Sequence, residues 1–170
     1  MLLLISGSPH PQSANSRLLK GIATISGKEA TRSDYLADLP VFQPDRDKAP
    51  WPPNVLRWRS ELTQADAVII STPAYLHNIP GVLKNALDWL ASSGEFAGKP
   101  TLVFTFTPHP PRGDKARQSL LWSLQALGAR IVAECPLYQN EVQFTENGDI
   151  AAGPERALLL EALSLLIPSS

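Results

Sequence analysis

The sequence predicts an α/β fold in which a five-stranded parallel sheet of order 2-1-3-4-5 carries helices on both faces. Short apolar runs alternate along the chain with stretches of helical periodicity, as in repeated βαβ units. Runs such as AVIIS at 67–71 are apolar throughout, which is typical of strands buried on both faces. With 170 residues, 44% of them hydrophobic, the chain suits one buried core, so we expect one domain over residues 1–170.

The first half of the chain predicts two strands and two helices. A strand over Leu2–Ile5 leads through a Gly/Ser/Pro loop into a helix over Ala14–Ser26. Moderate β-branched and aromatic content predicts the second strand over Ala30–Leu36. Five prolines in residues 40–53 restrict the backbone and indicate a long irregular connection before a helix over Asn54–Gln64.

The second half continues the alternation. Residues 101–107 form the clearest strand by β-branched and aromatic content, Gly128 takes the usual place after a helix end, and Pro154 suits the first turn of a helix. The expected elements are the strands Ala67–Ser71, Thr101–Thr107 and Ala129–Ala133 and the helices Pro80–Ser92, Asp114–Leu127 and Pro154–Leu166.

Composition and charge exclude several classes of function. A net charge of -1 suggests no extended basic surface for nucleic acid or anionic membrane. Cys135, the single cysteine, cannot form an internal disulfide and is expected to be a packing thiol. The apolar start MLLLISGS is too short for a signal peptide, and no segment reaches the roughly 20 apolar residues of a membrane span. We expect a cytoplasmic protein without a metal site, in which acidic pairs such as Asp45 and Asp47 are solvated.

Ligands of such sheets bind beyond the carboxyl ends of the strands where the strand order reverses, which points to the loops after strands one, three and four. In the first loop, hydroxyls and an amide precede a helix whose N-terminus favours an anion, and Gly7 permits close backbone approach. The spacing matches neither a Walker A loop nor a GxGxxG fingerprint. Such residues also commonly cap helices, so Ser13 or Asn15 has this simpler alternative role. In the second loop, Tyr75 and His77 could border a planar ring or merely cover a helix start.

Two motifs carry a resemblance to a known family. The segment at 73–89, PAYLHNIPGVLKNALDW, resembles the Pro-Glu-Tyr-Asn-x-x-Ile-Pro-Gly-x-Leu-Lys-Asn-Ala-Leu-Asp-Trp motif of the NADPH-dependent FMN reductases. Gly7, Ser8, Ser13 and Asn15 match the same family's Gly-Ser-x-Arg-x-x-Ser-x-Asn pattern. The resemblance implies a flavodoxin-like fold, FMN as cofactor, NADPH or NADH as electron donor, and a small acceptor such as a flavin or quinone. It also implies a homodimer or homotetramer.

The resemblance further implies which residues contact FMN. Those expected at the phosphate are Ser8, His10, Ser13, Asn15, Ser16 and Arg17, and those expected beside the ring are Pro73, Ala74, Tyr75 and Leu76, with Thr107, His109 and Gly113 from the third loop. Arg17 has the alternative role of a solvated helix residue. Because the flavin itself performs the redox chemistry, no catalytic side chain is expected.

The chain departs from the family pattern in all three loops. His10 replaces a permanently charged arginine, and Ala74 and Leu76 replace a glutamate and an asparagine. In the third loop, prolines at 108, 110 and 111 replace a Ser/Gly-rich turn and remove backbone donors. These departures favour, as an alternative, a binding module with weakened FMN affinity. A flavodoxin-like electron carrier is a further alternative, disfavoured because the charge balance provides no acidic docking face.

Overall fold

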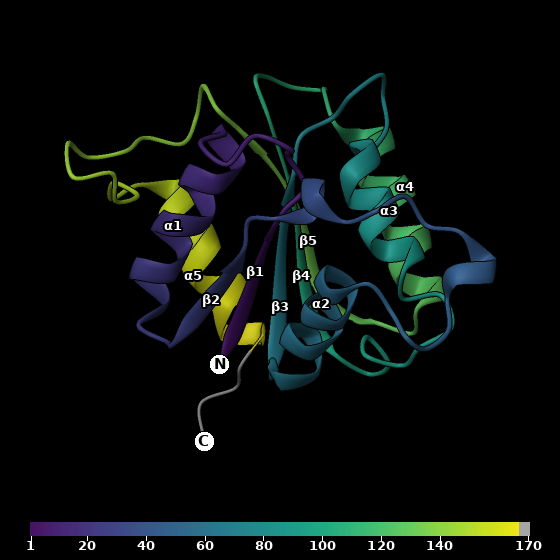
Figure 1. Ribbon diagram of the computed structural model, residues 1–170. Helices are drawn as coiled ribbons and strands as arrows, with labels where there is room; N and C mark the ends of the chain where they lie inside the picture. Colours follow the sequence, from purple (N-terminus) through teal and green to yellow (C-terminus); the bar gives the residue numbers. More distant parts are fainter. Residues whose placement is uncertain (167–170) are drawn as a thin grey trace.

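A computed structural model describes residues 1–166, and the last four residues of the predicted domain, 167–170, lie outside the described part. The strands form one parallel sheet of order β2-β1-β3-β4-β5, which confirms the predicted fold (Figure 1). The strands are β1 (Leu2–Ser6), β2 (Ala30–Ser33), β3 (Ala67–Thr72), β4 (Pro100–Thr107) and β5 (Arg130–Tyr138).

Helices cover both faces of the sheet. They are α1 (Ala14–Ser26), α2 (Pro53–Gln64), α3 (Gly81–Asp88), α4 (Asp114–Ala126) and α5 (Pro154–Leu166), with short 3-10 helices η1 (Leu36–Asp38) and η2 (Pro44–Arg46). Because successive strand residues point to opposite faces, Leu2 and Leu4 pack under α1 and α5, whereas Leu3 and Ile5 pack under α2, α3 and α4. Figure 1 shows α1 and α5 on one side of the sheet and α3 and α4 on the other. None of the helices within residues 1–166 is long and apolar enough to span a membrane.

Strand β2 is shorter than the sequence predicts. It ends at Ser33 instead of Leu36, and η1 begins at Leu36. The chain leaves the sheet because Glu61 of α2 accepts hydrogen bonds from the Tyr35 hydroxyl, 2.8 Å away, and from Ser33 Oγ. Burial, reinforced by the bond to Glu61, raises the pKa of Tyr35 well above its usual 10.0, so the hydroxyl remains a donor.

Helix α3 ends at Asp88, before the predicted limit of Ser92. The guanidinium group of Arg59, on α2, donates to the Trp89 carbonyl from Nη2 at 2.8 Å and from Nε at 3.3 Å. The next turn tightens, because the Leu90 N–H donates to Leu87 at 3.0 Å. The carbonyl at the helix end thus has a distant side-chain partner, which the local sequence does not show.

Strand β5 is longer than predicted, since it continues past Ala133 to Tyr138. Its residue Pro136 lies opposite Thr105 of β4. A proline lacks the N–H that a second neighbouring strand would need, but β5 is an edge strand with β4 as its partner. The proline therefore does not end the strand.

Two residues of the motif at 73–89 hold the proline-rich connection at 40–53. Asn85 accepts a hydrogen bond from the Phe42 N–H at 2.8 Å and donates to the Pro40 carbonyl at 3.0 Å. Trp89 Nε1 donates to the same carbonyl at 2.7 Å. These bonds fix the connection against α3, so this part of the motif builds the fold.

The prediction that both acidic residues of this connection are solvated is wrong for Asp47. Asp45 is exposed, but the Asp47 side chain is only 7% exposed and lies 2.8 Å from Arg59 Nη2. Trp51 Nε1 also donates to Asp47, at 3.2 Å. Burial by itself raises the pKa of Asp47, but hydrogen bonds from Ser92 and Trp51 and the charge of Arg59 outweigh it and hold the pKa below its usual 3.8.

We expect Asp47→Asn to lower the free energy of unfolding by about 1–3 kcal/mol at pH 7, because it removes the nearer of the two carboxylates that pair with a buried guanidinium group; the other, Glu95, lies 3.9 Å from Arg59 Nε. The folded-state pKa lies below 3.8, so the contribution of Asp47 is present above that pH and is lost as the pH falls through the folded value. Urea unfolding at neutral and strongly acidic pH should show the deficit shrinking in acid. Asp45→Asn is the matched control and should leave stability within about 0.5 kcal/mol; an equal deficit in both variants would contradict the assignment.

Candidate functional site

The loops after β1, β3 and β4 meet at one edge of the sheet, along the top of Figure 1. Strand order reverses here, because β1 lies between β2 and β3. A cavity of about 640 Å³ lies between the second and third of these loops. It is lined by Ala74, Leu76 and His77 from the second loop and by His109 and Pro111 to Lys115 from the third loop and the start of α4.

The first loop ends in a side-chain cap on α1. Ser13 Oγ accepts a hydrogen bond from the Ser16 N–H at 3.1 Å, which confirms the capping role of Ser13. The Ser16 hydroxyl lies 3.0 Å from Ser13 Oγ and donates to Ser6 Oγ at 3.2 Å. The N–H groups of Ala14 and Asn15 belong to the first turn, where a helix offers no acceptor, so they can serve an anion.

Asn15 is buried and bonds to the sheet. Its Nδ2 donates to the Phe106 carbonyl of β4 at 3.3 Å, and its Oδ1 accepts from Ser71 Oγ of β3 at 2.7 Å. The side chain therefore connects the start of α1 to two strands that lead into the other loops. Only its backbone N–H is available to the predicted phosphate.

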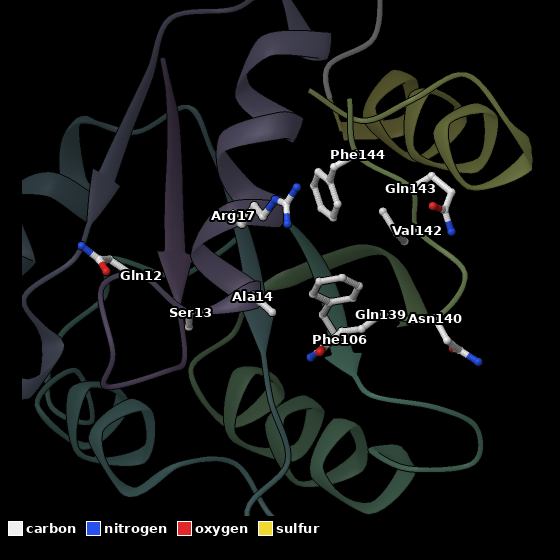
Figure 2. A pocket seen from close by; sticks show the side chains of 10 residues that line it. All are labelled: Gln12, Ser13, Ala14, Arg17, Phe106, Gln139, Asn140, Val142, Gln143 and Phe144. Carbon is white, nitrogen blue, oxygen red and sulfur yellow. The ribbon is translucent and has the colours of Figure 1, made fainter. Parts of the chain in front are cut away.

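His10 and Arg17, the predicted cationic contacts, lie differently. His10 is exposed. Its ring Nδ1 accepts a hydrogen bond from the Gln12 N–H at 3.0 Å, and its backbone N–H donates to Ser8 Oγ at 3.2 Å. Arg17 lies 4.1 Å above the centre of the Phe144 ring, in a groove that Gln12, Ser13 and Ala14 also line. Figure 2 shows this groove, of about 580 Å³, between α1 and the segment after β5. Arg17 is thus exposed, as its alternative role implies, but it packs against a ring.

Gly7 brings the first loop against its neighbours. A Cβ atom at this position would lie 2.5 Å from Thr72 Oγ1 and 2.9 Å from Leu83 Cδ2. Both neighbours are fully buried and cannot move aside. The absence of a side chain therefore sets how closely the first and second loops approach.

We expect Gly7→Ala to destabilise the chain by about 1–3 kcal/mol, because the methyl group overpacks this contact. Chemical unfolding measures the change. Gly94→Ala is the control, since a Cβ there meets nothing within 4 Å, and it should cost less than about 0.5 kcal/mol. Equal stability of the two variants would show that the first loop shifts freely.

The second loop contains a tight turn with unusual backbone angles. The N–H groups of Tyr75 and Asn78 donate to each other's carbonyls, at 2.8 and 2.9 Å. Leu76 and His77 between them have φ values of 49° and 63°, a left-handed conformation that Asn and Gly adopt far more readily. Leu76 is 98% exposed and Tyr75 48%, whereas Ala74 is buried and Pro73 half-buried. An apolar side chain is therefore presented to solvent at the cavity mouth at some conformational cost.

Thr107 and Gly113 shape the third loop. Thr107 Oγ1 is buried and donates to the Arg112 carbonyl at 2.6 Å, which closes the loop. Gly113 precedes α4 with a φ of 109°, and a Cβ there would lie 3.0 Å from Thr107 Cγ2. His109 is exposed at the tip. Lys115 also lines the cavity; sequence reasoning missed it, although its place in the first turn after the third loop was a usable signal.

Comparison with known proteins agrees with this architecture. The family described as NADPH-dependent FMN reductase matches residues 1–141. An NAD(P)H-dependent FMN reductase from Pseudomonas aeruginosa is 34% identical over 105 residues, which are 60% of this chain and 57% of that protein. A quinone reductase from Escherichia coli is 33% identical over 120 residues, which are 69% of this chain and 63% of the relative. The chain thus spans less than two thirds of the length of either relative.

A solved structure shares the fold. The flavoenzyme NAD(P)H:(acceptor) oxidoreductase from Paracoccus denitrificans superimposes with a TM-score of 0.84 at 23% identity, over 97% of this chain and 93% of that one.

Proposed function

The chain belongs to the NADPH-dependent FMN reductase family, and we propose that it binds FMN and passes electrons from NADPH or NADH to small acceptors such as flavins and quinones. The observation that carries the proposal is the cavity of about 640 Å³ between the loops after β3 and β4, at the sheet edge where the loop after β1 leads into an anion-favouring helix start. When bound, FMN supplies hydride acceptance and electron transfer. The protein then has to bind and orient FMN and to shield the site from water.

The residues present fit the two ends of FMN. At the phosphate end, the hydroxyl of Ser8 and the N–H groups of Ala14 and Asn15 are donors on one loop and one helix start, which Ser13 caps. His10 lies on the same loop. In this proposal the side chains of Asn15 and Ser16 position the loop, and Arg17 flanks it.

At the ring end, the cavity offers apolar walls and few donors. Ala74 suits the face of a planar ring, with Pro73 and Tyr75 next to it in the chain, and the exposed Leu76 and Pro111 border that ring at the open side of the cavity. Because prolines lack an N–H, the backbone donors left in the third loop include those of His109 and Gly113, which we assign to the polar ring edge. Thr107 acts by holding the loop closed.

The decisive experiment is a titration of the purified chain with FMN, followed by addition of NADPH and a quinone. Binding at micromolar FMN and acceptor-dependent oxidation of NADPH or NADH support the proposal. Absence of both FMN binding and NAD(P)H oxidation would overturn the proposal. Binding without NAD(P)H oxidation would favour an electron carrier.

His10 provides a sharper test of the phosphate end. We expect His10→Arg to tighten FMN binding about tenfold, equivalent to about 1.4 kcal/mol, because a guanidinium group offers a permanent charge and paired donors. Quenching of flavin fluorescence measures the affinity. Riboflavin, which lacks the phosphate, is the matched control and should bind both forms equally. If His10→Arg tightened the binding of riboflavin as much as that of FMN, residue 10 would not belong to the phosphate site.

A binding module with weakened FMN affinity is the second candidate, favoured by the prolines at 108, 110 and 111. The same titration separates the two, since such a module shows no binding at micromolar FMN. We further propose a homodimer or homotetramer, supported by the 64% exposed Trp122 on α4, and a cytoplasmic location, where NADPH and NADH are available.

A further inference from the structure

The rim of the cavity between the second and third loops is rich in nitrogen-bearing side chains. His77 comes from the second loop, and His109, Arg112 and Lys115 come from the third loop and the first turn of α4. Because the chain as a whole has a net charge of -1, this local excess does not follow from composition. It is a property of this one site.

The charges on this rim are not neutralised within the site. Its single carboxylate, Asp114, lies 3.6 Å from Arg117 Nη2, and Arg117 also lies 3.6 Å from Glu134, so the site keeps two cationic side chains against one carboxylate. Within residues 1–166, Arg112 and Lys115 form no ion pair. Two permanent cations therefore face solvent at the mouth.

Helix α4 adds to the same field. It is 13 residues long, and Gly113 before it has no side chain with which to cap the first-turn N–H groups. Asp114 and Lys115, whose N–H groups belong to that turn, line the cavity. The partial positive charge of the helix start and the two cations therefore favour the same guest, an anion.

The same cavity also has hydrocarbon surface, contributed by the buried Ala74 and by the exposed Leu76 and Pro111. An inorganic anion alone would leave that surface unused. A small neutral ring would leave the cations unused. With the flavin ring at Ala74 and the FMN phosphate at the first loop, the exposed Leu76 and Pro111 and the two cations are left for a second ligand, and together they fit one that carries both parts.

We propose that this cavity selects planar quinoid acceptors that carry an anionic substituent, a sulfonate or a carboxylate. The acceptor ring lies at the open side of the cavity, beside the exposed Leu76 and Pro111, and the anionic group lies at Arg112 and Lys115. The inference rests on the proposed reductase function and names its acceptor class. In turnover, a hydride equivalent from NAD(P)H and one solvent proton convert the quinone to the hydroquinone, NAD(P)⁺ is released, and the substituent is unchanged.

The test is a binding measurement without electron donor. Calorimetry compares anthraquinone-2-sulfonate with the neutral 2-(hydroxymethyl)anthraquinone, with and without saturating FMN. We expect the sulfonate to bind about tenfold more tightly, with the ratio falling as salt is raised. In the double variant Arg112→Gln with Lys115→Gln the ratio should drop to about two or less. Both residues are exposed, so the fold should be retained, as unfolding curves can verify.

A matched control changes the net charge equally but elsewhere. Lys20→Gln with Lys28→Gln alters exposed residues on α1 and just after it, and the ratio should stay near ten. Equal affinities for the two probes in the unaltered chain, or an equal drop in the control, would overturn the proposal. The proposal would also be overturned if the double variant bound NADPH more weakly relative to NADH but kept the sulfonate preference, because the cations would then bind the 2′-phosphate of the electron donor.

Failure of the reductase proposal is separately visible. The titration involves no turnover. If the chain prefers the sulfonate but oxidises no NAD(P)H, the reductase proposal is refuted and the anion-selective cavity stands. If the chain oxidises NAD(P)H but does not prefer the sulfonate, only the proposed acceptor class is refuted.

Discussion

The buried amide of Asn15 is the contact on which the arrangement of the site depends. It joins the first turn of α1 to Ser71 of β3 and to the Phe106 carbonyl of β4, while its neighbour Ser16 bonds to Ser6 of β1. Each of these strands leads into one of the three loops of the site. Since a buried amide left without partners costs about 1–3 kcal/mol, this network strongly favours one relative position of the loops.

A second network, away from the site, explains why the motif at 73–89 is so recognisable. Asn85 and Trp89 bond to the proline-rich connection, and Arg59 bonds to both Trp89 and Asp47. The side chains of Asn85 and Trp89 therefore satisfy backbone groups of the part-buried connection. The motif identifies the family chiefly through the packing of α3, and the chemistry of the cavity depends on the less typical residues before it.

Those less typical residues give the cavity its character. Leu76 and His77 hold left-handed backbone angles at its mouth, and the third loop replaces backbone donors with prolines and a cationic rim. Strained backbone conformations tend to cluster at ligand sites, where the strain is part of the function. A cavity lined by both hydrocarbon and cationic side chains is consistent with a planar, negatively charged guest.

The sequence by itself determined the strand order, the positions of most helices and strands, the three loops at the carboxyl edge and the capping of α1 by Ser13, because these follow from local periodicity, turn chemistry and the topology of parallel sheets. Tertiary structure decided the rest. It ended β2 at Ser33 and α3 at Asp88, buried Asp47, directed the Asn15 side chain into the sheet and placed Arg17 over Phe144. In most of these cases the deciding partner lies far away in the sequence, and a side chain's hydrogen-bond or charge partner becomes known only when the fold brings the two together.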